Sequence, residues 1–169
     1  IINSDMQEFD RITDILIRLK NKGKCLYVCG NGGSSATASH ATNDFIKAGE
    51  IRAMSLTDAS LLTAYSNDES YDMCFARILE RMMLSGDILL CMSVSGTSPN
   101  ILEAVKCSKK IRNKVIVLMG KVRKENKVLL SLSDLHISID SMDYKLVEDT
   151  HLMICHGFVA GLEYMKGKR

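Results

Sequence analysis

The sequence CLYVCGNGGSSATASHATND, residues 25–44, carries the clearest structural signal in the chain. Its first five residues are apolar and are followed by a glycine-rich turn at residues 30–33. Small residues with helical spacing begin at Ser34. This order predicts a strand, a tight turn and a helix, and the free N–H groups at the start of that helix attract an anion such as phosphate. His40 and Asp44 are spaced i, i+4, so they share one side of the predicted helix as a candidate acid/base or metal-ligand pair.

Predicted helices alternate with predicted strands on both sides of this stretch. Apolar runs predict strands at residues 25–29, 51–56, 88–92, 114–119 and 135–139. Helical periodicity predicts helices at residues 6–20, 34–47, 71–84, 101–110 and 144–166, with short helices after Asp58 and at residues 129–132, and a polar loop at residues 66–72. Such alternation predicts an α/β fold, a three-layer αβα sandwich around a parallel five-stranded sheet that binds ligands at the carboxyl ends of its strands.

Composition narrows the classes of function. The 169 residues are 46% hydrophobic and 25% charged, which predicts one globular domain over residues 1–169. The net charge of +2 and the absence of a long basic run argue against a nucleic-acid partner. No apolar stretch reaches the roughly 20 residues that span a membrane, and the first residues lack a secretion-signal layout. Six cysteines, mostly inside apolar segments, fit reduced thiols, so we expect a soluble cytoplasmic protein with no membrane partner.

A second group of polar residues follows the predicted strand at residues 88–92. Ser93, Ser95, Thr97 and Ser98 surround Gly96, just before a helix that begins near the only proline. Their hydroxyls and the backbone N–H groups at the helix start could enclose a phosphate without a lysine. The alternative is an ordinary serine-rich turn that caps the helix. Neither this loop nor GNGGSS matches a nucleotide-binding fingerprint, so nucleotide binding is disfavoured.

The final helix supplies further candidates. Glu148 and His156 are two turns apart and share one face, whereas His151 is rotated away from them. His151 is either a helix-surface residue or a residue that supports the site from behind. His136 lies inside a predicted strand and is expected to be a core or interface histidine. A carboxylate and an imidazole within reach of each other are sufficient for general acid–base proton transfer.

These blocks together resemble the sugar-isomerase (SIS) domain family, and within it the phosphoheptose isomerases. The resemblance rests on GNGGSS with His40 and Asp44, SND at residues 66–68, SVSGTS at residues 93–98 and EDTHLMICH at residues 148–156. It covers nearly the whole chain. It implies a flavodoxin-like sheet, a homotetramer with active sites between subunits, and conversion of the phosphorylated sugar sedoheptulose 7-phosphate to D-glycero-D-manno-heptose 7-phosphate.

The resemblance also implies roles for individual residues. The acid/base pair falls on Asp44 and His156, and the zinc ligands, in members that hold zinc, fall on His40, Asp44, Glu148 and His156. Substrate contacts fall on Asn31, Gly32, Gly33, Ser34, Asn67, Asp68 and Glu148, and the phosphate is held by Ser93, Val94, Ser95 and Ser98. Val94 replaces a usual threonine and so removes one hydroxyl from the phosphate site.

The sequence departs from the family pattern at the centre of the site. Asp44 stands where the family has glutamate, and a carboxylate that is one methylene shorter is displaced by more than an ångström. Glu148 stands where the family has glutamine, and the added negative charge favours a divalent cation. Lys145 replaces an acidic residue. Two alternatives therefore stay open: a non-catalytic scaffold resembling the SIS protein that binds the bacterial replication initiator, and an isomerase of another sugar phosphate.

Overall fold

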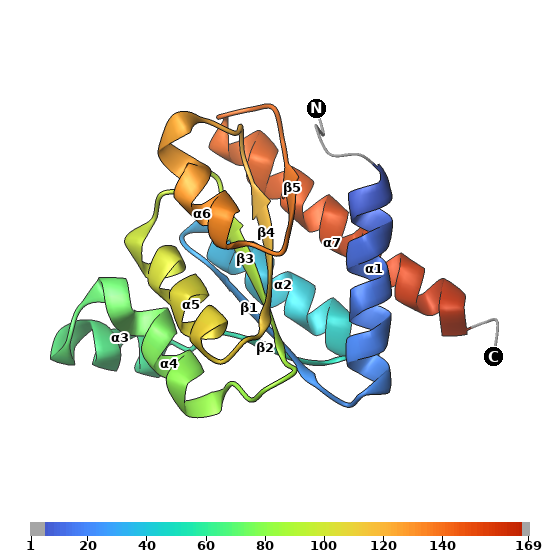
Figure 1. The fold of residues 1–169 in the computed structure, drawn as a ribbon, viewed down its shortest axis with the longest axis horizontal. Coiled ribbons are helices and arrows are strands. Elements are labelled where there is room, and N and C mark those ends of the chain that lie inside the picture. Colours follow the sequence, from blue (N-terminus) through green and yellow to red (C-terminus); the bar gives the residue numbers. More distant parts are fainter. Residues whose placement is uncertain (1–5, 167–169) are drawn as a thin grey trace.

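The computed structural model describes residues 6–166, and a parallel five-stranded sheet lies at its centre (Figure 1). The strands run in the order β2-β1-β3-β4-β5. Their bounds are β1 Cys25–Gly30, β2 Arg52–Ser55, β3 Ile88–Ser93, β4 Lys114–Met119 and β5 Leu135–Ser138. The chain leaves β1 toward one edge and returns to β3 on the other side, which opens a crevice at the carboxyl ends of these two strands. The predicted fold class is confirmed.

Helices cover both faces of the sheet and give the predicted three layers. One face is covered by α1 Met6–Asn21, α2 Gly33–Lys47 and α7 Tyr144–Lys166. The other is covered by α3 Ala59–Asp68, α4 Cys74–Met82, α5 Pro99–Lys110 and α6 Lys127–Leu132, with short 3₁₀ helices η1 Tyr71–Met73 and η2 Lys124–Asn126. Figure 1 shows the two helix layers on opposite sides of the sheet.

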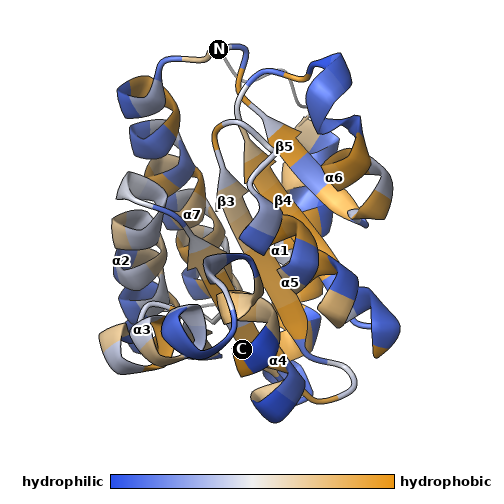
Figure 2. Cartoon of the chain, turned by 90° about the vertical axis from the view of Figure 1, so that its left-hand side faces the viewer, coloured by the Kyte–Doolittle hydropathy of each residue, from blue (hydrophilic) through white to orange (hydrophobic). Residues whose placement is uncertain are grey.

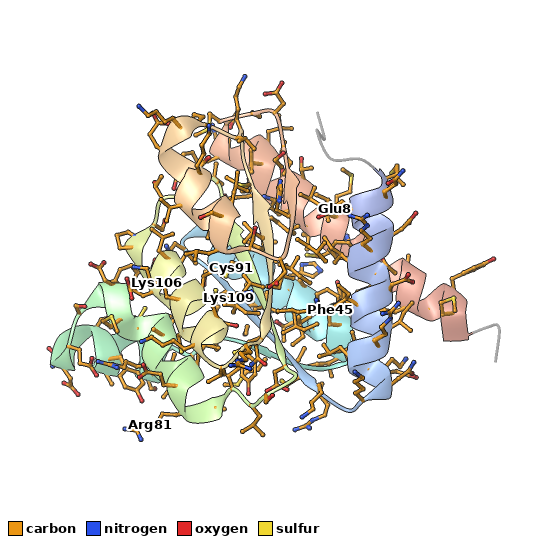
Figure 3. All side chains as sticks on the ribbon, viewed as in Figure 1. Glu8, Phe45, Arg81, Cys91, Lys106 and Lys109 are labelled. Carbon is orange, nitrogen blue, oxygen red and sulfur yellow. The ribbon has the colours of Figure 1, made fainter. Side chains whose placement is uncertain are left out.

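Alternating side chains of the strands form two hydrophobic cores. Leu26 and Val28 pack with α1, α2 and α7, whereas Tyr27 and Cys29 pack with the helices of the other face. Figure 2 shows the sheet as an apolar layer between helices whose outer surfaces are hydrophilic. Phe45 of the first core, labelled in Figure 3, is fully buried. Burial of such a side chain stabilises the folded state by roughly 1.5–3 kcal/mol.

Helices α2 and α7 pack against each other, and this contact brings the two halves of the candidate site together. The buried side of α2 carries small residues, among them Ser34, Ala38 and Ala41, which allow α7 to approach closely. On its other flank α7 packs against α1, where Phe9 and Phe158 stack with ring centroids 4.7 Å apart. The position of α7 is therefore fixed from two sides.

The structure corrects two details of the predicted secondary structure. Residues 66–68 form the last turn of α3 and not a loop; the helix begins at the Asp58 cap and ends with the Glu69 N–H donating to the Tyr65 carbonyl at 3.0 Å. The helix predicted at residues 71–84 begins as a 3₁₀ turn and continues as α4. All six cysteines are free thiols. Within residues 6–166 no helix has the length and apolar character needed to cross a membrane.

Candidate active site

A carboxylate between two imidazoles forms the first part of the site. Asp44 Oδ2 lies 3.2 Å from His156 Nε2 and 3.3 Å from His40 Nε2. The two rings meet edge to face, with centroids 5.3 Å apart. His40 and Asp44 share a face of α2 as their spacing predicts, and the packing of α7 supplies His156. The second oxygen of Asp44 accepts a hydrogen bond from Asn43 Nδ2 at 3.1 Å, which orients the carboxylate.

This cluster is open to solvent on one side and closed by the core on the other. About half of each imidazole side chain is exposed, 52% for His40 and 51% for His156, against 25% for Asp44. Cys155 lies behind the cluster in the core, where burial, together with the charge of Asp44, raises the pKa of its thiol to about 12. Cys155 therefore stays protonated and takes no part in proton transfer.

The cluster has the donor set of a metal site. One ligand atom from each of His40, Asp44 and His156 lies within 4.8 Å of the others. Two imidazole nitrogens and a carboxylate oxygen are donors that suit zinc. Glu148 is not a member of this group, because its carboxylate contacts Ser34 instead. Its role as a fourth ligand stays a prediction.

The second part of the site is a small cavity of about 60 Å³ at the carboxyl end of β3. The predicted phosphate residues line it together with residues from β1, α2 and α7; the lining is Asn31, Ser34, Met92, Ser93, Val94, Ser95, Ser98, Tyr144 and Glu148. Ser98 is the N-cap of α5, yet its side chain makes no capping hydrogen bond, so this hydroxyl is available to a ligand. The cavity is far smaller than the roughly 300–1,000 Å³ of whole-ligand pockets, so it fits one end of a substrate.

The loop at residues 93–98 is held rigidly in place. Ser93 Oγ accepts a hydrogen bond from the Gly96 N–H at 3.1 Å. Gly96 adopts a φ of +67°, and a side chain there would collide with Asn126. Asn126 is fully buried and donates to the carbonyls of Ser95 at 3.2 Å and Lys121 at 3.0 Å. Nothing in the sequence pattern singled out Asn126 as the support of this loop.

The predicted anion at the start of α2 is a carboxylate of the protein itself. Glu148 Oε1 accepts hydrogen bonds from the Ser34 backbone N–H at 3.0 Å and from the Ser34 hydroxyl at 3.4 Å. Gly33 makes room for this contact, because a Cβ at that position would overlap the Glu148 carboxylate. The helix start attracts negative charge as expected, but the charge comes from α7.

Asn31 is fixed by a side-chain network that the sequence analysis missed. Its amide exchanges two hydrogen bonds with the buried amide of Asn100, at 2.9 and 2.8 Å. Tyr71 Oη donates to Asn31 Oδ1 at 2.8 Å. Asn31 directly follows β1, Asn100 lies in the first turn of α5, and Tyr71 is the first residue of η1. No local sequence pattern could have linked residues so far apart in the chain. Tyr144, at the start of α7, is a further lining residue that the sequence analysis did not select.

The remaining candidates lie apart from these contacts. Asn67 and Asp68 are exposed in the last turn of α3, where Asn67 Nδ2 donates to Asp68 Oδ1 at 3.0 Å. Gly32 is exposed at the N-cap of α2 with a φ of +55°. His136 is half-buried in β5. His151 is completely buried, which removes the helix-surface interpretation, and burial lowers its pKa to about 4 against a smaller opposing effect of the Met119 backbone.

The fold and the site define a class: a doubly wound α/β protein with polar loops at its topological switch point and a carboxylate–imidazole cluster on the adjoining helices α2 and α7. The family model described as the SIS domain matches residues 1–120, and the chain belongs to this family. The phosphoheptose isomerase of Dechloromonas aromatica is 35% identical over 160 residues, which cover 91% of this chain and 80% of that protein.

Two solved structures are similar over almost the whole chain. A phosphoheptose isomerase from Francisella tularensis superposes with a TM-score of 0.87 at 26% identity, covering 96% of this chain and 88% of that one. The phosphoheptose isomerase from Neisseria gonorrhoeae gives a TM-score of 0.85 at 27% identity, covering 94% and 86%.

Proposed function

We propose that this chain is a phosphoheptose isomerase that interconverts sedoheptulose 7-phosphate and D-glycero-D-manno-heptose 7-phosphate. The observation that carries the proposal is the 3.2 Å contact between Asp44 Oδ2 and His156 Nε2. The same two helices, α2 and α7, also line the small cavity through Ser34 and Glu148. An anion-binding cavity and a proton-transfer pair are therefore mounted on one rigid pair of helices.

The reaction requires two proton movements that this pair can perform. A proton leaves C1 of the ketose to give a 1,2-enediol, and a proton added at C2 gives the aldose, while a second proton passes between the two neighbouring oxygens. A carboxylate and an imidazole in hydrogen-bond range can share these tasks, and we assign them to Asp44 and His156. The reaction needs no oxidant, because the hydrogen removed from one carbon is balanced by that gained at the next.

The serine loop holds the phosphate in this proposal. Ser93, Ser95 and Ser98 contribute hydroxyls and the start of α5 contributes N–H groups, with Val94 as an apolar wall. We assign a sugar contact to Asn31, whose amide is oriented by its hydrogen bond to Asn100. The other proposed sugar contacts are Gly32, Gly33, Ser34, Asn67, Asp68 and Glu148.

A zinc ion fits His40, Asp44 and His156, with Glu148 as the proposed fourth ligand. When bound there, zinc would polarise the substrate carbonyl and stabilise negative charge on its oxygen. His40 Nε2 lies 3.3 Å from the same oxygen of Asp44 that His156 approaches, so the carboxylate is placed between the two imidazoles with or without the ion. Removal of metal with a chelator, followed by zinc or magnesium, tests whether turnover depends on this ion.

We also propose a cytoplasmic homotetramer of single-domain subunits with active sites between them. The half-exposed imidazoles and the small cavity support a site that a second subunit completes. Large apolar side chains on α7 are exposed in the single chain, including Met153 at 58% and Tyr164 at 65%. Light scattering of the purified protein measures the number of subunits directly.

Incubation with sedoheptulose 7-phosphate, followed by NMR of the anomeric protons, tests the activity. We expect aldose to appear with the unmodified protein and turnover to fall at least a hundredfold in His156→Gln and in Asp44→Asn. Asp14→Asn, an exposed acid on α1, is the matched control and should retain full activity. Absence of turnover with and without zinc would refute the proposal and favour the non-catalytic scaffold, whereas turnover of a different sugar phosphate alone would correct the substrate.

A further inference from the structure

A second cavity lies at the opposite edge of the sheet, where the strands begin. Its volume is about 290 Å³, and it lies between the end of α1 and the loops that lead into β3 and β4. The end of α1 is the lower end of the blue helix in Figure 1. The candidate active site lies at the carboxyl ends of the strands, so a ligand in this second cavity does not compete with the substrate.

Four cationic side chains line this cavity: Arg18 of α1, Lys22 just after α1, Arg112 in the loop before β4, and Lys114 as the first residue of β4. Across residues 6–166, none of these four has an ion pair with a carboxylate. Other cations nearby are paired, as Lys109 is with Asp134 at 2.8 Å. The cavity therefore concentrates positive charge that the protein does not neutralise with a local salt bridge.

The single acid in the lining is committed to holding the backbone. Asp87 is buried, and its two oxygens accept from the N–H groups of Cys25 at 2.9 Å and Leu84 at 2.8 Å. Four positive charges thus face one negative charge. Exposed charges of this density attract multivalent anions, and they do so less strongly as the salt concentration rises.

The walls of the cavity are fixed before any ligand arrives. The buried Asn113 side chain accepts from the Gly86 N–H at 2.8 Å and donates to the Leu84 carbonyl at 2.9 Å. This ties the loop before β3 to the loop before β4, while Asp87 ties it to the start of β1. A site that is already ordered loses little conformational entropy on binding.

Arg112 occupies a position whose backbone conformation suits glycine. It follows the C-cap of α5 with a φ of +59°, a conformation that costs an L-residue about 1–2 kcal/mol relative to glycine. Its N–H donates to the Lys109 carbonyl at 3.0 Å and closes the helix. The helix end alone requires no guanidinium there, and a guanidinium is the side chain best matched to a phosphate group.

The remaining lining is apolar. Leu19 and Ile88 are buried and Ile15 is partly buried, so the cavity combines an apolar surface with a cationic rim. We propose that this cavity binds a nucleotide-class polyphosphate, with the base against Ile15, Leu19 and Ile88 and the phosphates against Arg18, Lys22, Arg112 and Lys114. The proposal is independent of the isomerase activity.

Calorimetric titration of the unmodified chain with ADP tests this assignment. We expect ADP to bind, to bind more tightly than inorganic pyrophosphate because of the apolar surface, and to weaken as salt rises. The double variant Arg18→Gln/Arg112→Gln should lower the affinity for ADP at least tenfold. The matched control Lys47→Gln/Arg81→Gln removes two exposed charges elsewhere, one of them the solvent-directed Arg81 of Figure 3, and should bind ADP as the unmodified protein does.

A second pair of variants separates this cavity from the serine loop, which could also attract phosphate. Ser95→Ala/Ser98→Ala should leave ADP affinity unchanged. No ADP binding at millimolar concentration, equal affinity for ADP and pyrophosphate, or loss of binding only in the serine variants would each overturn the proposal. Circular dichroism and the melting temperature verify that each variant is folded, which we expect because the four substituted cations are exposed.

Discussion

Glu148 of α7 holds the first turn of α2 by accepting from both the backbone N–H and the hydroxyl of Ser34, at 3.0 and 3.4 Å. Its carboxylate also lines the small cavity that we assign to the phosphate. One residue therefore locks together the two helices of the site and places a negative charge where a negatively charged substrate must bind. A glutamine at this position, as in the family that the sequence resembles, would hold the two helices together without adding the negative charge.

Replacing Glu148 with glutamine should separate these two effects. We expect KM for the sugar phosphate to fall five- to tenfold, since removing a repulsion of about 1.4 kcal/mol changes affinity tenfold. The free energy of unfolding should fall by about 1 kcal/mol, because a neutral amide interacts less with the helix start. Steady-state kinetics and urea unfolding measure both. Asp149→Asn, which removes the same charge from an exposed neighbour, should change neither, and an unchanged KM in Glu148→Gln would contradict the repulsion.

Gly33→Ala should push the Glu148 carboxylate away from Ser34, because the new Cβ would occupy its place. Overpacking of this kind costs about 1–3 kcal/mol of stability. In a Glu148→Ala background the same substitution should be almost neutral, since the colliding group is gone. Thermal unfolding of the four proteins in this double-mutant cycle gives the coupling between the two positions, and a coupling near zero would refute the steric account.

Asn100→Ala should lower kcat/KM at least tenfold although Asn100 lies beneath the cavity. The substitution removes two of the three hydrogen bonds that orient the Asn31 amide and leaves its Nδ2 unpaired, at a cost of about 1–3 kcal/mol in stability. Tyr71→Phe removes only the hydroxyl that donates to Asn31 and should show a smaller loss of the same kind. If Asn100→Ala lost stability but kept normal KM and kcat, Asn100 would be structural only.

Because His151 is buried, we expect the free energy of unfolding to depend on pH. Burial lowers its pKa from 6.5 to about 4, so between these values the unfolded chain takes up a proton that the folded chain does not. Stability should be full above pH 6.5 and decline as the pH falls toward 4, by roughly 3 kcal/mol in total. Urea unfolding at several pH values measures this decline. His151→Leu should flatten the curve in that range, whereas the control His136→Gln, at a half-buried histidine, should leave it intact.

Much of the architecture followed from local sequence alone. The apolar runs, the glycine turn after residue 29 and the alternation with amphipathic segments predicted the α/β layers and the parallel sheet, because strand and helix periodicities are local properties. The i, i+4 spacing likewise predicted that His40 and Asp44 share a face, and the structure brings them to 3.3 Å. The predicted extent of α3 was wrong, because residues 66–68 are polar and carry no apolar periodicity, yet they continue the backbone hydrogen bonds of the helix.

Only the tertiary structure decided which distant residues meet. Helical periodicity predicts that His156 lies on a helix and which face of it His156 shares. The packing of α7 on α2 determines that this face contacts Asp44. The same packing directs Glu148 to Ser34 and away from the metal-type cluster, and the meeting of β1 with α5 pairs Asn31 with Asn100. The physical reason is that contacts between elements depend on how buried surfaces fit together, and a local pattern contains no information about its partner.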